Sequence, residues 1–573
     1  MNDHTPAGRD RIIGGIRERM AHDSAIRHVT GTAIYVDDIP EPRGTLHIHP
    51  FCSDRAHARI SQLDLSRVRT APGVHAVLTA ADIPGENDWG HAGVGDDRVL
   101  SDRLVEYAGQ VIFAVVAESV AQARTASLLA IISYEDLPVI LTVEDAMRTG
   151  STHLPPRTLT RRDAKARIAA APHRLDGRVA SGAQEHFYLE TQITLAVPRE
   201  SGDVSLFCST QDPSSVQSLV ARILARPANA VSVEVRRLGG GFGGKETVAT
   251  HFAAIAALAA VRTGRACKLR LDRDDDMRIT GKRHEFFSDF SVGFDDEGRI
   301  AGLEIDIHPR CGNSIDQSVE VLARAAFHVD NCYHIGDLRA TCHYWKTNTV
   351  SAVAFRGFGT PQAFLLIESI LDRIARHLGL DPLAVRKTNF YAGRGRDTTP
   401  FGAPIPFEIL HRLVAEAEGS ADYARRRREI DAFNAASPCL KKGLALTPIK
   451  YGCGFGVSFL NQGGALLHVY RDGSIHLNHG GTEMGQGLHI KVAQVVAEEL
   501  QVDLRHIAIS ATSTEKVPNT IGTAASSGTD LNAGAARDAA RIIRQRLIDF
   551  ACDEFKVPPG QVEFLPNRLR IGN

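Results

Sequence analysis

Residues 239–246 read GGGFGGKE, and the fold of the surrounding chain is built around this short stretch. It follows a predicted strand, VSVEVRRL at 231–238, and precedes a predicted apolar helix, VATHFAAIAALAAV at 248–261. A glycine-rich loop between a strand and a helix lets backbone N–H groups lie close to a ligand. The stretch therefore predicts an α/β segment with a ligand-binding loop.

A nicotinamide cofactor is one alternative for this loop. The loop fits GxGxxG, and Asp272 ends the next predicted strand, as in a dinucleotide-binding crossover. However, the loop lies in the middle of the chain, Asp272 comes later than the roughly 20 residues expected, and Phe242 would crowd the turn. A phosphate-binding P-loop is excluded because Lys245 is followed by Glu246 rather than Ser or Thr. An NAD-binding enzyme remains as a minor hypothesis.

Similar glycine loops recur along the chain. They lie at 354–362 (AFRGFGTPQ), 480–487 (GGTEMGQG) and 523–528 (TAASSG). One glycine loop indicates only a tight turn. Several of them, each with a polar or aromatic side chain, indicate a large cofactor held by backbone groups from distant segments.

Composition narrows the class of protein. The chain has 573 residues, 43% hydrophobic and 23% charged, which is typical of a globular protein with several domains. Lys and Arg number 66 against 67 Asp and Glu, so the net charge is −1, which argues against nucleic-acid and anionic-membrane partners. No apolar run approaches the roughly 18–20 residues that span a bilayer, and the first residues do not resemble a secretory signal. We therefore expect a cytoplasmic protein whose partners are proteins or small molecules.

The cysteine and histidine patterns do not predict a metal site of their own. Nine cysteines are scattered without a CxxC pair, which fits a reducing compartment and argues against an iron–sulfur cluster held by this chain. His47 with His49, and His186 with Glu190, have metal-like spacings. Neither pair comes with further ligands, so we expect ordinary structural roles for all four.

The fold class predicted is α+β, with a small N-terminal α/β domain followed by two large α+β domains. The residues VEFLPNRLRIGN are interpreted as a strand that stops on Gly572-Asn573, the start of a hairpin whose returning strand is missing, so the last domain is expected to be incomplete. The predicted divisions are a polar segment at 1–23, the small domain at 24–147, a polar, proline-containing linker at 148–172, and the large domains at 173–435 and 436–573.

Six motifs identify a family. The sequence resembles the molybdenum-cofactor subunit of the xanthine dehydrogenases, within the molybdenum hydroxylases, over residues 24–573. The resemblance implies that 24–147 is a hammerhead-like domain and that the two large domains bind molybdopterin. The motifs occur in the family's order, with similar gaps, as QEHFYLET (184–191), GGGFGGKE (239–246), RAAFHVDNCY (324–333), AFRGFGTPQ (354–362), FLNQGGALLHVY (459–470) and GGTEMGQG (480–487).

The resemblance also implies a molybdopterin cofactor whose molybdenum carries oxo and sulfido ligands. Gln211 is similar to the residue that hydrogen-bonds the oxo group. Phe242, Arg356 and Ala525 are similar to the loop positions whose backbone contacts the metal centre. The other cofactor contacts implied are Gly243 and Gln486.

The substrate implied is a purine, hypoxanthine or xanthine, oxidised to urate. Glu246 and Arg324 are similar to the pair that orients the purine, and Phe358 and Phe455 to the rings that sandwich it. A flat heterocycle packs well between two phenyl faces, while Arg324 can stabilise negative charge and Glu246 can relay a proton. Gly456 stands where the family commonly has a hydroxyl residue.

Comparison within the family leaves two other functions open. Related aldehyde oxidases generally lack the Glu246–Arg324 pair, and carbon monoxide dehydrogenases carry a cysteine where this chain has Gly357. The family's general base, a Glu in a Gly-Glu-Pro-type segment, is expected beyond residue 573, so no catalytic residue is predicted within the chain. The alternatives are a truncated, non-catalytic homologue and a related aldehyde or N-heterocycle hydroxylase.

The resemblance further implies a partner. Electrons from the molybdenum centre pass through [2Fe–2S] clusters to FAD in the family. Because this chain lacks cluster cysteines, both groups are expected on a partner subunit, in a dimer of heterodimers that acts in purine catabolism.

Overall fold

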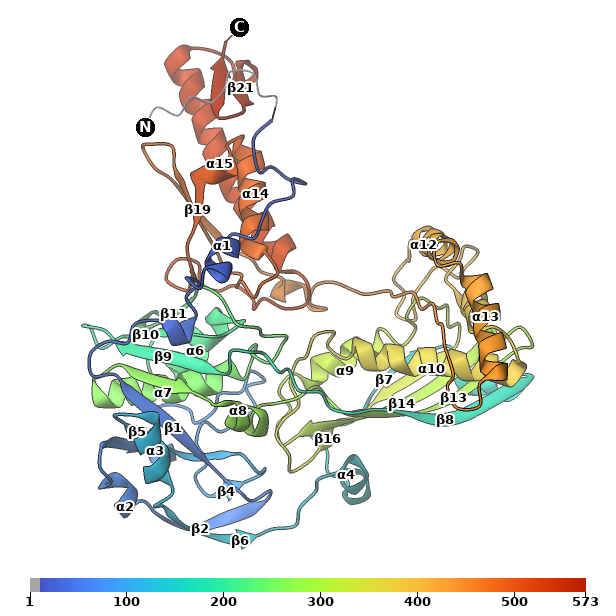
Figure 1. The fold of residues 1–573 in the computed structure, drawn as a ribbon, viewed down its shortest axis with the longest axis horizontal. Coiled ribbons are helices and arrows are strands. Elements are labelled where there is room, and N and C mark those ends of the chain that lie inside the picture. Colours follow the sequence, from blue (N-terminus) through green and yellow to red (C-terminus); the bar gives the residue numbers. More distant parts are fainter. Residues whose placement is uncertain (1–10, 573) are drawn as a thin grey trace. The chain divides into compact units, whose positions relative to one another are not determined.

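The computed structural model describes residues 11–572 of the chain, which form two compact units (Figure 1). The first unit combines residues up to 139 with 185–281 and those from 453 on, and the second combines 140–184 with 282–452. Each unit is thus assembled from segments that are far apart in the sequence. The predicted α+β class is confirmed, since both units mix helices with sheets.

An eight-stranded sheet forms the centre of the first unit. It is mixed, because β1 pairs in parallel with β12, and β10 with β11, while the other pairs are antiparallel. Every residue of β5 is buried, as expected for a continuous apolar run covered on both faces. In sheet order the strands are β20 (Thr512–Ser513), β11 (Val231–Val235), β10 (Val204–Cys208), β9 (Ile193–Pro198), β12 (Cys267–Arg270), β1 (Leu46–Cys52), β5 (Val111–Ala117) and β3 (Val74–Leu78).

The predicted apolar helix that follows the glycine loop is present as α7 (Ala249–Thr263). Twelve of its residues are buried, most of them alanines, whose small side chains let the helix pack closely on β9 and on α6 (Pro213–Ile223). It ends at Gly264, whose φ of 65° is the left-handed conformation that glycine adopts readily. The other helices of this part are α1 (Ala25–Val29), α2 (Ser66–Arg69), α3 (Val120–Ser127) and α8 (Arg273–Ile279).

Two three-stranded sheets also belong to the first unit. One contains β4 (Leu104–Val105), β2 (Ala58–Asp64) and β6 (Ile131–Asp136), and the other contains β17 (Ala465–Val469), β18 (Ile475–His479) and β19 (Ile507–Ile509). Two helices, α14 (Leu488–Leu500) and α15 (Gly528–Phe555), pack together and share an apolar core with the second of these sheets.

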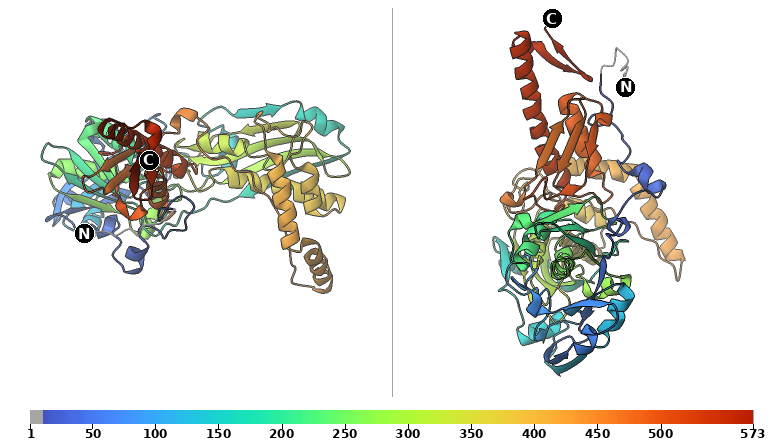
Figure 2. Two further views of the ribbon diagram at one scale, coloured as in Figure 1. Left: turned by 90° about the horizontal axis from the view of Figure 1, so that it is seen from above. Right: turned by 90° about the vertical axis from the view of Figure 1, so that its left-hand side faces the viewer.

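The prediction that the residues before Gly572 form a single strand is wrong, whereas the hairpin predicted to start at Gly572-Asn573 is not tested, because Asn573 lies outside the described residues. Instead, β21 (Val562–Leu565) and β22 (Arg568–Ile571) pair in antiparallel register beside the C-terminal end of α15 (Figures 1 and 2). The turn falls at Pro566-Asn567, where Asn567 has a φ of 57°. Asparagine tolerates this left-handed conformation, so a stretch that reads as one strand contains its own turn.

The second unit is built on a six-stranded sheet covered by helices α9 (Ser318–Ala326) and α10 (Thr360–Leu378). Its strands are β7 (Arg157–Arg161), β15 (Leu338–Cys342), β14 (Ile300–Gly312), β13 (Phe286–Phe294) and β8 (His173–Ser181), with β16 (Trp345–Lys346) paired to β14. Its helices are α4 (Val143–Thr149), α5 (Ala164–Ala170), α9 (Ser318–Ala326), α10 (Thr360–Leu378), α11 (Pro382–Asn389), α12 (Phe407–Ser420) and α13 (Tyr423–Ala436).

The segment 148–172, predicted as a linker, contributes regular structure to this second sheet. Its residues form β7, which pairs with β15, and α5, which packs against β14. β7 is an edge strand, and edge strands favour charged and polar side chains because these discourage pairing with another chain. Its sequence RTLTR therefore has the composition of a loop.

Among the described residues, no helix combines the length and apolar character needed to cross a membrane.

Candidate functional site

Three of the four glycine-bearing loops come together in the first unit, and Gln211 joins two of them. The Gln211 side-chain carbonyl accepts a hydrogen bond from Gly243 N at 2.8 Å, and its amide nitrogen donates to Thr523 O at 3.1 Å. The third loop is tied in by Thr482 N, which donates to Thr523 Oγ1 at 2.8 Å. Gln211 lies three residues after the end of β10 at Cys208 and is 3% exposed, so it reaches both loops from this edge of the sheet.

The backbone of the 239–246 loop is unusual. Gly240 and Gly243 have φ values of 97° and 98°, and Phe242 between them has a φ of 55°. A left-handed conformation is uncommon for an aromatic residue and occurs where the surroundings fix it, often at binding sites. Ala525 and Ser526 in the 523–528 loop share it, with φ values of 51° and 57°. Three positions that the resemblance assigns to the cofactor, Phe242, Gly243 and Ala525, are thus in strained or glycine-type backbone.

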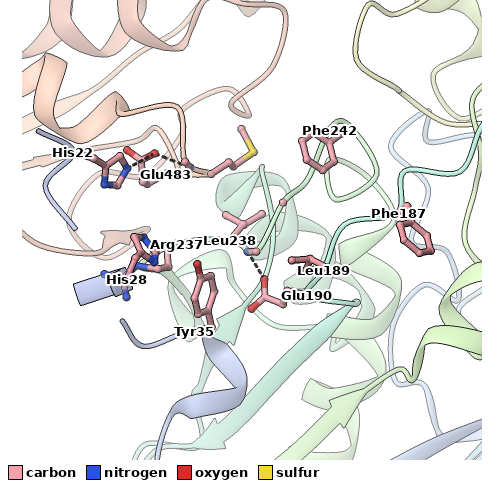
Figure 3. Close-up of a pocket in the computed structure, with 14 residues that line it drawn as sticks. His22, His28, Tyr35, Phe187, Leu189, Glu190, Arg237, Leu238, Phe242 and Glu483 are labelled. Carbon is pink, nitrogen blue, oxygen red and sulfur yellow. Dashed lines mark hydrogen bonds and ion pairs between the residues drawn. The ribbon is translucent and has the colours of Figure 1, made fainter. Parts of the chain in front are cut away.

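A pocket of about 560 Å³ opens beside these loops in the first unit (Figure 3). Phe187, Leu189 and Phe242 lie on one side of it, and His28, Tyr35 and Arg237 on the other. Backbone from two loops completes the lining at Gly239, Gly240, Met484 and Gly485. The volume lies within the roughly 300–1,000 Å³ typical of cofactor pockets.

Glu483 shapes the 480–487 loop from its buried position. One carboxylate oxygen accepts from Gly485 N at 2.9 Å and Gly487 N at 3.0 Å, and the other accepts from His489 N at 3.1 Å. The predicted cofactor residue Gln486 belongs to the same loop, where its amide nitrogen donates to Thr482 O at 3.0 Å.

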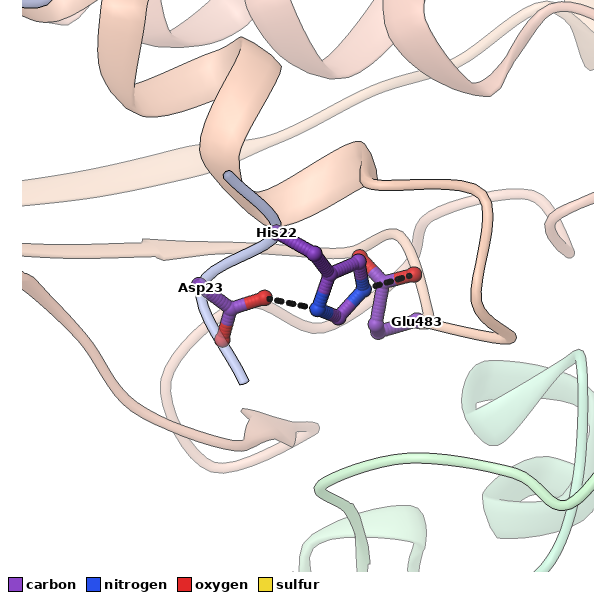
Figure 4. A group of neighbouring side chains, drawn as sticks. All are labelled: His22, Asp23 and Glu483. Atoms are coloured by element: carbon purple, nitrogen blue, oxygen red, sulfur yellow. Dashed lines mark ion pairs between the residues drawn. The ribbon is translucent and has the colours of Figure 1, made fainter. Parts of the chain in front are cut away.

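His22 and Asp23 bring the N-terminal part of the chain to this loop (Figure 4). His22 lies between the two carboxylates, with Nδ1 3.3 Å from Asp23 and Nε2 3.3 Å from Glu483. The three residues have the spacing of metal ligands, yet Glu483 already accepts three backbone hydrogen bonds. We therefore interpret the group as an ion-pair contact between segments.

Glu246 and Lys245 lie at the end of the glycine loop, just before α7. The Glu246 side chain is buried, and Lys245 is fully buried, which lowers its pKa although Glu190 opposes the effect. Lys245 Nζ lies 3.1 Å from a Glu190 carboxylate oxygen. Of the two residues with metal-like spacing, His186 and Glu190, Glu190 thus forms an ion pair with Lys245.

Phe455 and Gly456 also belong to the first unit. Phe455 N donates to Asn461 Oδ1 at 2.9 Å, and the neighbouring Gly454 N donates to Ala525 O at 2.8 Å. This brings Phe455 next to the 523–528 loop. A Cβ added at Gly456 would meet nothing within 4 Å, so a hydroxyl residue would fit there.

The remaining predicted residues, Arg324, Arg356 and Phe358, lie in the second unit. Phe358 has a φ of 52° and precedes α10, and the Arg356 carbonyl accepts from the Arg283 guanidinium at 2.9 Å. Arg324, on α9, donates to Gly452 O at 2.6 Å and its guanidinium lies 5.6 Å from the Tyr451 ring centre. The binding roles of all these residues remain predictions.

Family models match most of the chain. The model described as a molybdopterin cofactor-binding domain matches residues 149–390, and a second model with that description matches 416–572. The model described as the aldehyde oxidase and xanthine dehydrogenase a/b hammerhead domain matches residues 30–138.

Curated relatives agree with these matches. The chain is 43% identical over 546 residues to a xanthine dehydrogenase/oxidase of Felis catus, which covers 95% of this chain and 40% of the relative. It is 42% identical to a xanthine dehydrogenase of Calliphora vicina, over 95% of this chain and 39% of that relative. It is also 42% identical to an aldehyde oxidase 2 of Cavia porcellus, over 92% of this chain and 39% of that relative. The chain thus spans about 40% of the length of the Felis catus relative.

Solved structures share the fold at lower identity. Quinoline 2-oxidoreductase from Pseudomonas putida 86 superposes with a TM-score of 0.86 at 23% identity, covering 98% of this chain and 75% of that one. A CO dehydrogenase from Oligotropha carboxidovorans gives 0.84 at 22% identity over 98% and 76%. With the loops, the pocket and the matches together, the chain belongs to the molybdenum hydroxylase family, as the motifs predicted.

The first unit fits a pterin cofactor on its own geometry. Its glycine loops leave backbone exposed to the pocket at Gly239, Gly240 and Gly485. At Gly240 an added Cβ would lie 2.9 Å from the Phe242 ring, so only glycine suits the loop there. Glu190 and Lys245 were missed as part of this site. A lysine between a glycine loop and a largely apolar helix was the available signal.

Proposed function

We propose that this chain is the molybdopterin-binding part of a xanthine dehydrogenase that hydroxylates hypoxanthine and xanthine to urate. The observation that carries the proposal is the 43% identity to a xanthine dehydrogenase/oxidase over 95% of the chain. The buried carboxylate of Glu246, at the end of the candidate cofactor loop, supports a purine as the substrate. A cytoplasmic location and a role in purine catabolism belong to the same proposal.

The cofactor, when bound, supplies an oxo–sulfido molybdenum centre that accepts two electrons from the substrate. The residues of this chain would hold the ligands in position and place charged groups beside them. Gln211 has a second amide hydrogen besides the one given to Thr523, so it can donate to a ligand in front of the Gly243 loop. Glu246 would form a hydrogen bond with a ring nitrogen of the purine or relay a proton to it. Arg324 would stabilise negative charge on the ring.

We propose that electrons leave through [2Fe–2S] clusters to FAD on a partner subunit, in a dimer of heterodimers. This is supported by the cysteines of the chain, which are scattered and include no CxxC pair.

The test is a purine oxidation assay on the chain co-expressed with a cluster-carrying partner in a host that makes the cofactor. Turnover is followed with an artificial electron acceptor, and the molybdenum and pterin contents of the protein are measured alongside. We expect cofactor-loaded protein that oxidises xanthine once the general-base Glu expected beyond residue 573 is also supplied, and about a 100-fold loss of kcat/KM in Glu246→Gln, as for removal of one positioned polar group. Protein without molybdenum and pterin would refute the proposal.

An aldehyde or N-heterocycle hydroxylase is the second candidate. It is favoured by the aldehyde oxidase 2 relative at 42% identity and by Gly456, which lacks the hydroxyl common in the family. A panel of xanthine, benzaldehyde and quinoline separates the two candidates, because only the purine enzyme should depend on Glu246. Cofactor-loaded protein that turns over none of the three would favour the non-catalytic alternative.

A further inference from the structure

A buried ion pair joins the two ends of the glycine loop at the candidate cofactor site. Lys245 has no exposed surface, and its ammonium group donates to Glu190 O at 2.6 Å, to the Glu190 carboxylate at 3.1 Å and to Ser209 Oγ at 2.7 Å. An ammonium group has three hydrogens, so its donors are fully used. The nitrogen also lies 4.6 Å from the centre of the Tyr188 ring.

The same carboxylate holds the other end of the loop. The Glu190 oxygen that binds Lys245 accepts a hydrogen bond from Gly239 N at 2.9 Å. Gly239 packs so closely that an added Cβ would lie 2.4 Å from Glu190 Cβ. One ion pair therefore fixes the first residue of the loop, Gly239, and its seventh, Lys245, and so sets the distance that the loop spans.

The backbone of the last loop residues is held in the same way. Lys245 O accepts from Gln211 N at 2.8 Å, and Gly244 O accepts from the Gln192 amide at 2.9 Å. Gln192 also donates to Tyr188 OH at 3.0 Å. The ion pair and Gln211 thus act on one continuous piece of backbone, and Glu190 also lines the pocket (Figure 3).

We propose that Lys245 and Glu190 are positioning residues that set the shape of the 239–246 loop, so that the backbone it leaves exposed to the pocket retains the cofactor. This inference rests on the proposed function only in taking the ligand to be the molybdenum cofactor. A buried ion pair adds little net stability compared with a well-packed apolar pair, which favours a geometric role over a stabilising one.

A matched control exists in the same unit. Lys268 on β12 is also buried, with Nζ 2.8 Å from Asp37 and 2.9 Å from Glu41. No hydrogen bond links its side chain to the 239–246 loop. Lys268→Met therefore removes a buried lysine while leaving the loop untouched.

The experiment compares full-length wild type, Glu190→Gln, the double variant Lys245→Met/Glu190→Met, and Lys268→Met. Backbone hydrogen exchange is measured over 239–246, with molybdenum and pterin content per chain and the melting temperature. We expect Glu190→Gln and the double variant to exchange about tenfold faster in the loop and to lose most of the cofactor. Lys268→Met should change the melting temperature without either effect.

The double variant separates positioning from stability. A merely structural pair predicts that two apolar side chains restore the melting temperature and cofactor retention together. Positioning predicts that the melting temperature recovers while loop exchange stays fast and the cofactor is lost. Hydrogen-exchange protection of the loop at the wild-type level in both Glu190→Gln and the double variant would overturn the inference. A wild type that never holds molybdenum or pterin would instead refute the proposed function, and loop exchange would still decide the inference.

Discussion

Gln211 connects two loops through one amide, so its loss should be costly. Gln211→Ala leaves Thr523 C=O unpaired in buried surroundings and Gly243 N–H unpaired in part-buried surroundings. At about 1–3 kcal/mol for each unsatisfied group, we expect the free energy of unfolding to fall by about 2–4 kcal/mol. Urea denaturation followed by tryptophan fluorescence measures this.

Gln217 provides the matched control for that substitution. On α6 its amide donates to Ala228 O at 3.2 Å and Val231 O at 2.7 Å near the surface. Water can replace these bonds, so Gln217→Ala should cost less than about 1 kcal/mol. Equal losses in the two variants would contradict the bridging role of Gln211.

Gly240 should tolerate alanine less well than Gly264, although both have positive φ. At Gly240 (φ 97°) an added Cβ would lie 2.9 Å from the Phe242 ring and 3.0 Å from Tyr188 Cβ, whereas Gly264 (φ 65°) has open space. We expect Gly264→Ala to cost about 1 kcal/mol from backbone strain alone. Gly240→Ala should cost more and should displace Phe242, which thermal unfolding and cofactor content would detect. Identical melting temperatures would contradict this.

At the scale of elements, helix α7 and strand β7 show what local sequence can predict. The apolar run of α7 and its glycine terminator were sufficient to place the helix, because both signals are local. The composition of β7 predicts a linker, because an edge strand favours polar and charged side chains. Its antiparallel pairing with β15 makes this segment a strand, although its composition does not indicate one.

The β21–β22 hairpin should depend on Asn567. This residue has a left-handed backbone, and its side-chain oxygen accepts from Asp503 N at 2.7 Å. Asn567→Ala loses the hydrogen bond and strains the turn, so we expect a loss of about 1–2 kcal/mol in local stability. Asn567→Gly should lose less, since glycine keeps the turn. Hydrogen exchange of the β21 and β22 amides measures both, and a larger loss for glycine would contradict the argument.

At the scale of the whole molecule, buried histidines should make stability depend on pH. Burial lowers the pKa of His251 from 6.5 to about 4, while His251 Nε2 binds Val99 O at 2.8 Å and the ring stacks on Trp89. In the second unit, burial lowers the pKa of His284 to about 3. Between pH 6.5 and 4 the unfolded chain binds protons that the folded chain does not, so stability falls as the pH falls.

For His251 alone this loss amounts to about 2 kcal/mol at pH 5 relative to pH 8. His251→Gln keeps a donor for Val99 O and cannot titrate. Its free energy of unfolding should therefore fall less between pH 8 and pH 5 than that of the wild type, by about that amount. Parallel pH curves for the two proteins, from urea denaturation at each pH, would contradict the prediction.

Local patterns, and motifs that can be read in order, were enough to predict the α+β class, the glycine loops, α7 and the family. Only the tertiary structure brought Gln211 between Gly243 and Thr523, paired Lys245 with Glu190, and interleaved three segments of the chain in one unit. The reason is physical. Local propensity selects a helix, strand or turn, whereas the partner of a buried polar group depends on which distant strands lie side by side.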